Sequence, residues 1–355
     1  MHLARRMNRL GTETAFEVLA KARRLEAEGM DIVHLEIGEP DFDTPANIIE
    51  AGAEAISQGF THYGPSPGLS DVRERIAQEI SGALNISTTG ENVVITPGGK
   101  PIMFFTMLAL VDEGDEVLYP NPGFPIYESM VRFVGGVPVP MRLYESKGFN
   151  FDVEEVAGQV TPKTKLIIIN SPNNPCGSVM SREDVEALAD LARENDIVVL
   201  SDEIYRRFLY EGQHHSVATL PGMRDRTIIL DGFSKTYAMT GWRIGFGVMP
   251  LELVEPISRL VTNSVSCTAS FTQMAVVEAM NGPQEEAHNM VAEFKKRRDI
   301  IVQGLNRVSG IRCAMPKGAF YVFPNVMAVC NRLGIRSHGL ALYLLEGADD
   351  EFGVA

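Results

Sequence analysis

The sequence predicts an α/β fold: a three-layer α/β/α large domain with a mostly parallel seven-stranded sheet, joined to a small α+β domain. Short runs rich in β-branched residues alternate with amphipathic helices between about residues 90 and 250. Several runs are apolar at consecutive positions, which is typical of strands that a parallel sheet buries on both faces. After about residue 283 the pattern changes to one long amphipathic helix and short mixed segments. A chain of 355 residues has room for a large and a smaller domain.

Seven runs are predicted to form the large sheet. The step from the sixth run to the seventh leaves little room for a crossover helix, so we expect one antiparallel strand there. The runs are NVVIT (92–96), DEVLYP (115–120), VPVPMRL (137–143), TKLIIINSP (164–172), DIVVLSDE (196–203), RTIILDGF (226–233) and RIGFGVMP (243–250).

Helices are predicted where apolar residues recur at helical spacing. In the segment 68–84, Val72, Ile76 and Ile80 fall on one face. Ser181 with Asp184 forms an N-terminal cap for a helix over 182–195. The segment 283–308 is expected to be a long helix that leaves the large domain. We therefore place the large domain at 45–285 and the small domain at 1–44 and 286–355.

Composition restricts the classes of function. The net charge of −14 argues against a nucleic-acid partner, which needs a basic face. No segment has the roughly 18 uninterrupted apolar residues of a membrane span, so we expect no membrane association. The four cysteines lie far apart in the sequence, without the spacing of a metal or redox motif. We expect no metal site and a cytoplasmic, reducing compartment. These cysteines are Cys176, Cys267, Cys313 and Cys330.

One motif suggests a hydrolase but does not fit its chemistry. The stretch GPSPG at 64–68 matches the G-x-S-x-G pattern of a nucleophile elbow. The residue after the nucleophile must donate its backbone N–H to the oxyanion, and Pro67 has no N–H. We therefore expect an ordinary turn here.

Polar residues follow several predicted strands, at the edge where open α/β sheets bind ligands. Gly99 and Lys100 open a helix and would present backbone N–H groups to an anion. Asn174 follows another strand. Asp202 follows four apolar residues, and no cation lies beside it in the sequence until Arg206. A buried carboxylate needs a cationic partner, so either a local salt bridge or a ligand is expected.

A lysine and an arginine follow the strand RTIILDGF, in the stretch GFSKTYAMTGWRIG at 232–245. Taken alone, Lys235 and Arg243 suit a surface loop. Together with the other strand ends they match one ligand, pyridoxal phosphate. Its aldehyde needs a lysine, its pyridinium nitrogen a carboxylate, and its phosphate an arginine and backbone donors. The sequence thus predicts a pyridoxal phosphate site that includes Lys235, Asp202 and Arg243.

These motifs also resemble a known family. The stretch SKTYAMTGWRIG, with SPNNPCG (171–177), SDEIY (201–205), GGK (98–100) and GEPDFDTP (38–45), is similar to the class I/II aminotransferases of the aspartate aminotransferase-like fold, fold type I. The similarity runs from about residue 12 to the end. It implies that the chain forms a homodimer with shared active sites.

The resemblance implies a role for each matching residue. Lys235 would hold the cofactor as a Schiff base, with Asp202 facing the ring nitrogen. Asn174 and Tyr205 would bond the ring's phenolic oxygen, and Phe124 would stack on the ring. The phosphate would be held by Gly99, Lys100, Ser234 and Arg243, with Tyr63 reaching the phosphate of the neighbouring subunit. Gly38 would approach the substrate carboxylate, and Asn174 also belongs to this substrate-binding group.

The sequence departs from the family pattern at two places. Gly232 stands where some relatives have a serine that binds the phosphate, so Ser234 must contribute more. The family also binds the substrate α-carboxylate with an arginine in an R-[LI]-S-F-like strand near the C-terminus. The sequence ends at EFGVA, and Arg332 and Arg336 are not in such a motif. We expect that the sequence lacks this tail.

The predicted reaction is transamination between an L-amino acid and a 2-oxo acid. Acid–base work by Lys235 would require its pKa to fall from about 10.4 to about 7–8. Two alternatives stay open. A β-lyase or other fold type I lyase shares the same motifs. A pyridoxal-phosphate-binding regulatory domain would carry a DNA-binding domain, but only about 35 residues precede GEPDF.

Overall fold

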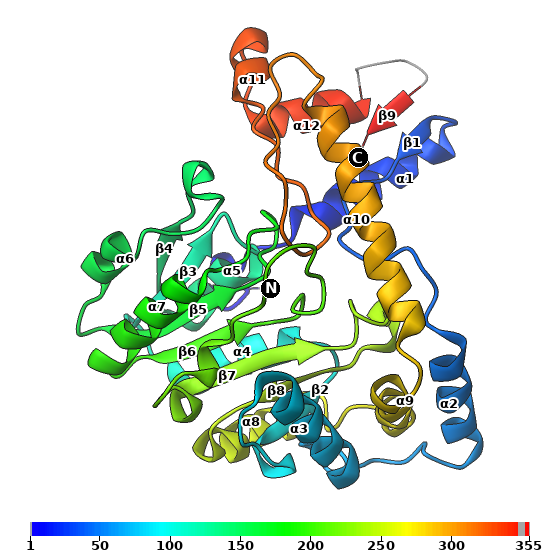
Figure 1. Cartoon of the computed structure of the whole chain (residues 1–355), viewed down its shortest axis with the longest axis vertical. Helices are drawn as coiled ribbons and strands as arrows, with labels where there is room; N and C mark the ends of the chain where they lie inside the picture. The colour runs from blue at the N-terminus through cyan, green and yellow to red at the C-terminus, as the bar shows by residue number, and fades with distance from the viewer. Residues whose placement is uncertain (1, 347–351, 355) are drawn as a thin grey trace.

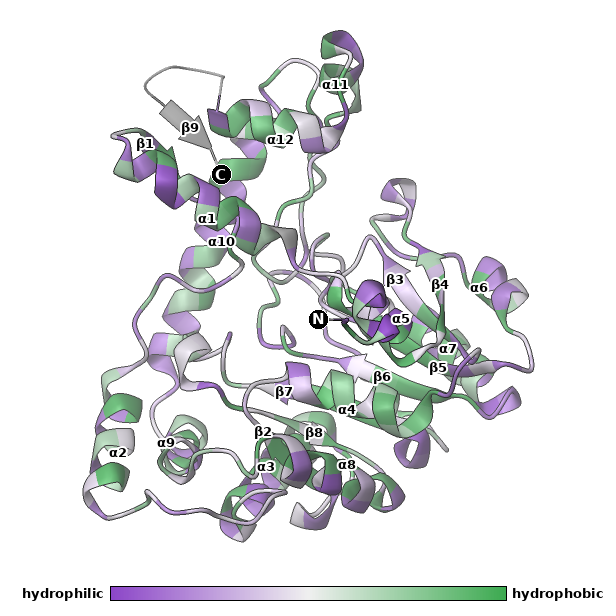
Figure 2. Cartoon of the chain, turned by 180° about the vertical axis from the view of Figure 1, so that it is seen from behind, coloured by the Kyte–Doolittle hydropathy of each residue, from purple (hydrophilic) through white to green (hydrophobic). Residues whose placement is uncertain are grey.

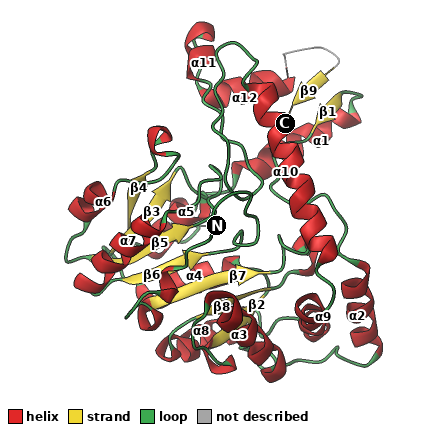
Figure 3. Ribbon diagram, in the orientation of Figure 1, coloured by secondary structure: helices red, strands yellow, loops and turns green. Residues whose placement is uncertain are grey.

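A seven-stranded sheet forms the centre of the larger part of the molecule (Figures 1 and 3). The computed structural model describes residues 2–346 and 352–354. Strand β8 is antiparallel to both of its neighbours, and the other pairs are parallel. All seven predicted runs form strands, with the antiparallel strand where it was expected. In spatial order they are β2 (Val93–Thr96), β8 (Gly245–Val248), β7 (Thr227–Gly232), β6 (Val198–Asp202), β5 (Thr164–Asn170), β3 (Glu116–Asn121) and β4 (Val137–Arg142).

Helices cover both faces of this sheet, which confirms the three-layer prediction. In β7, Ile228 and Leu230 pack into one core, whereas Ile229 packs into a core on the opposite face. Both faces of the strand are therefore apolar, as the consecutive apolar pattern predicted. One face is covered by α4 (Lys100–Leu110), α5 (Ile126–Val134) and α8 (Leu251–Ser264). The other is covered by α3 (Ser70–Leu84), α6 (Val153–Gln159), α7 (Arg182–Glu194) and α9 (Ser270–Asn281).

The local signals read from the sequence are also found. Val72, Ile76 and Ile80 are buried on α3. The Asp184 N–H donates to Ser181 Oγ over 3.0 Å and caps α7. The GPSPG stretch forms a turn, closed by the Gly68 N–H and the Pro65 carbonyl at 2.9 Å.

The remaining elements extend away from the large sheet along one long helix, α10 (Glu285–Leu305) (Figure 1). At its far end, β1 (Asp31–Val33) pairs in parallel with β9 (Phe352–Val354). This joins the two ends of the chain and agrees with the proposed division at residues 45 and 285, which stays a proposal. Beside them lie α1 (Thr14–Ala27), α11 (Met327–Leu333) and α12 (Ser337–Glu346), while α2 (Ala46–Ser57) packs on α9.

Hydrophobic and hydrophilic residues alternate along the outer helices (Figure 2). Within the part of the chain that the structure describes, no helix is both long and apolar enough to cross a membrane. Single turns of 3₁₀ helix lie at Arg5–Arg9, Gly90–Asn92, Glu145–Lys147, Val217–Thr219, Arg224–Arg226 and Thr240–Trp242.

Candidate active site

A cavity of about 750 Å³ lies at the carboxyl ends of the central strands, between the sheet and α1. It brings together predicted residues that lie far apart in the sequence. Tyr63, the remaining predicted residue, does not line it. The predicted residues in its wall are Gly38, Gly99, Lys100, Phe124, Asn174, Asp202, Tyr205, Ser234, Lys235 and Arg243.

Asp202, at the end of β6, is buried, and no cation among the described residues pairs with its carboxylate. Its side chain accepts the Tyr127 hydroxyl at 2.7 Å and the Ile204 N–H at 3.3 Å. Burial raises the pKa of Asp202 to about 6, and nearby Asp231 and Glu203 add to the rise, although both hydrogen bonds oppose it. The carboxylate is therefore able to pair with a cationic group that enters the cavity.

Arg206, the local cation that could have neutralised Asp202, binds elsewhere. Its Nε donates to Asp231 Oδ2 at 2.5 Å, and both side chains are largely buried. Asp231 lies on β7, one strand away from Asp202. The salt-bridge explanation of Asp202 is therefore wrong.

Asn174 and Tyr205 are held by a hydrogen-bond network beside Asp202. The Asn174 N–H donates to Asn170 Oδ1 at 2.7 Å, and Asn170 Nδ2 donates to the Asp202 carbonyl at 3.0 Å. The hydroxyls of Tyr205 and Tyr321 lie 2.5 Å apart. Asn170 and Asp202 are paired across β5 and β6, so the sheet register itself places these polar groups together.

Lys235 lies opposite, just after β7. Its Nζ donates to the Gly38 carbonyl at 2.5 Å. The pKa of Lys235 falls to about 8, chiefly because the amine is buried, with Lys100 and Arg243 adding to the fall and Glu39 and Glu13 opposing it. This is the range that acid–base work requires.

Arg243 and the turn before α4 form a site suited to an anion. The backbone of Arg243 is left-handed, with φ of +54°, and its guanidinium donates to the carbonyls of Thr240 at 2.7 Å and Pro97 at 3.4 Å. The turn residue Gly98 has φ of +86°, and a Cβ there would clash with the Arg243 guanidinium. A Cβ on Gly245 would lie 2.6 Å from the backbone nitrogen of Gly99. Small residues thus let the arginine and the helix start approach each other.

The side chain of Lys100 has a partner that the sequence did not predict. Its ammonium pairs with Glu13 and lies 5.5 Å from the centre of the Phe124 ring. Its backbone N–H remains at the start of α4, so the predicted contact between that N–H and the phosphate stays a prediction.

Several residues of the cavity were missed. Tyr127 was visible in the motif NPGFPIY, but nothing in the sequence showed that its hydroxyl meets Asp202. Glu13 and Phe16 come from the N-terminal segment, whose contact with the cavity no motif indicated. Neither Arg332 nor Arg336 lines the cavity, whereas Arg23 on α1 does.

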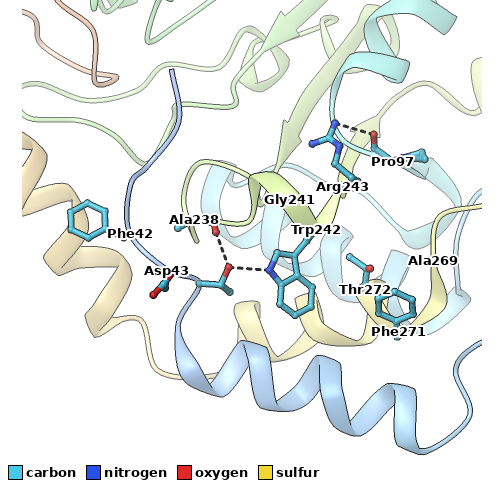
Figure 4. A pocket seen from close by; sticks show the side chains of 11 residues that line it. Phe42, Asp43, Pro97, Ala238, Gly241, Trp242, Arg243, Ala269, Phe271 and Thr272 are labelled. Carbon is cyan, nitrogen blue, oxygen red and sulfur yellow. Dashed lines mark hydrogen bonds between the residues drawn. The ribbon is translucent and has the colours of Figure 1, made fainter. Parts of the chain in front are cut away.

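Tyr63 is 89% exposed and does not line its own chain's cavity. A second hollow of about 600 Å³ lies beside the cavity, and Gly241 and Arg243 line both (Figure 4). The side chain of Trp242 lies in its wall, where its Nε1 donates to Thr44 Oγ1 at 3.0 Å. Arg243 therefore borders two openings, the cavity and the second hollow.

Comparisons with known proteins identify the family of the chain. The family described as "Aminotransferase class I and II" matches residues 30–347. A probable aspartate/prephenate aminotransferase of Aquifex aeolicus is 38% identical over 350 residues, covering 98% of this chain and 89% of the relative. An aromatic-amino-acid aminotransferase 2 of Thermococcus litoralis is 40% identical over 305 residues, covering 84% and 78%. The structure of an aspartate aminotransferase from Thermus thermophilus with maleate superposes with a TM-score of 0.92 at 36% identity, covering 99% and 91%.

An α/β sheet with a lysine and a buried carboxylate at its strand ends is the architecture of fold type I enzymes, which use pyridoxal phosphate. The chain belongs to the class I and II aminotransferases. It is therefore a pyridoxal-phosphate-dependent aminotransferase, and the lyase alternative is not favoured.

Proposed function

We propose that the 750 Å³ cavity binds pyridoxal phosphate and that its residues carry out transamination between an L-amino acid and a 2-oxo acid. The observation that supports this best is Asp202, a buried carboxylate. Arg206, the next arginine in the sequence, pairs with Asp231 instead. A protonated pyridine nitrogen is the kind of partner this carboxylate lacks. Arg243, Ser234 and the N–H groups at the start of α4 suit a phosphate.

When bound, the cofactor supplies an aldehyde that condenses with amines and a ring that accepts electrons from the substrate's Cα bond. Asp202 would hold the proton on the ring nitrogen. Asn174 and Tyr205 would orient the ring by hydrogen bonds, and Phe124 would pack on it. Lys235 Nζ, with its lowered pKa, would take the proton from the substrate Cα and deliver it to the cofactor's aldehyde carbon, on the other side of the amino nitrogen. Gly38, whose carbonyl holds Lys235 Nζ, belongs to the loop that meets the substrate carboxylate.

We also propose that the active form is a homodimer in which the partner's Tyr63 completes the site. The exposure of Tyr63 and the second hollow beside Arg243 (Figure 4) support this. A tyrosine hydroxyl entering that hollow could donate to the same phosphate oxygens as Arg243.

The proposed compartment is the cytoplasm. The four cysteines are free thiols, and three of them are buried. Free cysteines suit a reducing environment.

The experiment that tests the function combines a spectrum with a reaction. The purified protein should take up pyridoxal phosphate, and borohydride should fix the cofactor covalently to Lys235. Lys235→Ala should lose this fixation, and cofactor that is still fixed would overturn the assignment of the lysine.

Amino donors with oxo-acid acceptors should then give a new amino acid and a new oxo acid in equal amounts. Steady release of ammonia and pyruvate from a cysteine conjugate, without any acceptor, would instead identify a lyase.

A further inference from the structure

The side chain of the substrate is a separate question within this same site, so the following inference rests on the proposed function. The relatives named above include enzymes called aspartate, prephenate and aromatic aminotransferases. The substrates in these names include compounds with charged side chains and compounds with uncharged ones. The residues of the cavity that would meet the substrate side chain contribute to the choice between them.

The first observation is the ion pair of Glu13 and Lys100 inside the cavity. Glu13 directly precedes α1, and Lys100 is the first residue of α4. The ammonium lies 5.5 Å from the centre of the Phe124 ring and 5.9 Å from that of Phe16. The ammonium therefore lies over the ring that is proposed to pack on the cofactor, and the pair lines the cavity that the substrate would enter. Glu13 neutralises the cation that an acidic side chain would otherwise meet.

The second observation is Glu36, whose side chain is only 4% exposed. One carboxylate oxygen lies 2.7 Å from His34 Nδ1. The other is buried without a hydrogen-bond partner in the described part of the chain, and the residue lines the cavity. A buried oxygen without a donor repels a second carboxylate and accepts an uncharged N–H or O–H group.

The other cations of the cavity do not replace Lys100. Lys235 and Arg243 are assigned to the cofactor. Arg23 is exposed and follows Glu13 by ten residues along α1, about 15 Å along the helix axis, which places it far from the Glu13–Lys100 pair. Between them the wall is largely apolar, with Phe16, Leu19 and Met103.

We propose that Glu13 is a specificity-determining residue that pairs with Lys100 and excludes substrates with a side-chain carboxylate, so that the preferred amino donors have uncharged side chains. Replacing Glu13 with glutamine frees the ammonium and should admit acidic donors. This gain in reactivity toward acidic donors should depend on the Lys100 ammonium.

The test measures the first half-reaction, followed by the absorbance of the bound cofactor, so that no oxo-acid acceptor is needed. The holoenzyme should react with phenylalanine or alanine at least ~10-fold faster than with aspartate, in second-order rate constants. Glu13→Gln should raise the ratio of aspartate to phenylalanine by at least ~10-fold, and the further change Lys100→Gln should remove that gain. Glu17→Gln is the matched control, because Glu17 lies one turn away on α1, is exposed, and does not line the cavity.

Two results would overturn the proposal: a parent enzyme that prefers aspartate, or a Glu13→Gln variant with an unchanged ratio. If no donor reacts at all, the proposed function fails, but selectivity can still be measured. Succinate and propionate are then titrated against the cofactor absorbance. The role of Glu13 is supported if the parent binds propionate more tightly than succinate and if Glu13→Gln raises the affinity for succinate alone. It is contradicted if Glu13→Gln changes the affinity for both ligands equally.

Discussion

Asp202 is a buried carboxylate that should lower the stability of the cofactor-free protein at neutral pH but strengthen cofactor binding. Its pKa lies at about 6 in the folded chain, above the ordinary 3.8. The folded state therefore binds the proton more tightly, and stability is lost as the pH rises from about 4 to 6. Over that range the loss amounts to up to about 3 kcal/mol. We expect Asp202→Asn to raise the free energy of unfolding of the cofactor-free protein at pH 8 and to weaken pyridoxal phosphate binding, measured by denaturant titration and by absorbance.

Asp231 provides the matched control, because it is also buried but has a partner. Asp231→Asn leaves Arg206 buried with a weakened partner, so this variant should lose roughly 3–5 kcal/mol at pH 8. The benefit of Asp202→Asn should shrink at pH 4, where the aspartic acid is already protonated in the folded chain. An Asp202→Asn protein that is less stable than the parent at pH 8 without cofactor would contradict this account.

The turn between β2 and α4 depends on a glycine for two separate reasons. Gly98 has φ of +86°, and a Cβ there would meet the Arg243 guanidinium. Gly59, after α2, has the same φ of +86° with no atom within 4 Å of its Cβ position. Alanine at either position should therefore cost about 1–2 kcal/mol of stability through backbone strain. Only Gly98→Ala should also displace Arg243 and lower the affinity for pyridoxal phosphate, by ~10-fold or more, measured by cofactor titration; equal affinities for the two variants would refute the role of this turn.

The elements that the sequence predicted well are those whose signal is local. Consecutive apolar residues identified the buried strands, and the residue that ends each strand then had to lie at one edge of the sheet. Asp202 and Lys235 could be found in this way. Tyr127, Tyr321 and Glu13 could not, because each reaches the site through the packing of a distant segment. Helical periodicity can place Tyr127 on the buried face of α5. It cannot show that the tyrosine hydroxyl donates to an aspartate 75 positions later in the sequence.

At the scale of the whole molecule, one residue predicted to bind the cofactor, Tyr63, lies outside the cavity of its own chain. Tyr63 is exposed. The hollow beside Arg243, whose lining side chains Figure 4 shows, is open to the outside. A C2 dimer could bring the two together, because each subunit would offer its tyrosine to the site of the other. This arrangement differs from a tyrosine that acts within its own chain, and the difference can be measured.

Two variants that are impaired alone should restore activity when they are paired in one dimer, if the sites are shared. Lys235→Ala removes the catalytic amine, and Tyr63→Ala removes the residue that would reach the phosphate of the partner's site. In a heterodimer of the two, one site combines the intact Lys235 of one subunit with the intact Tyr63 of its partner. Co-expression with two different tags and tandem purification should therefore yield about half the activity of the parent dimer, whereas each variant alone stays inactive or strongly impaired. If Tyr63 serves its own chain, neither site of the heterodimer is complete, and no activity should return.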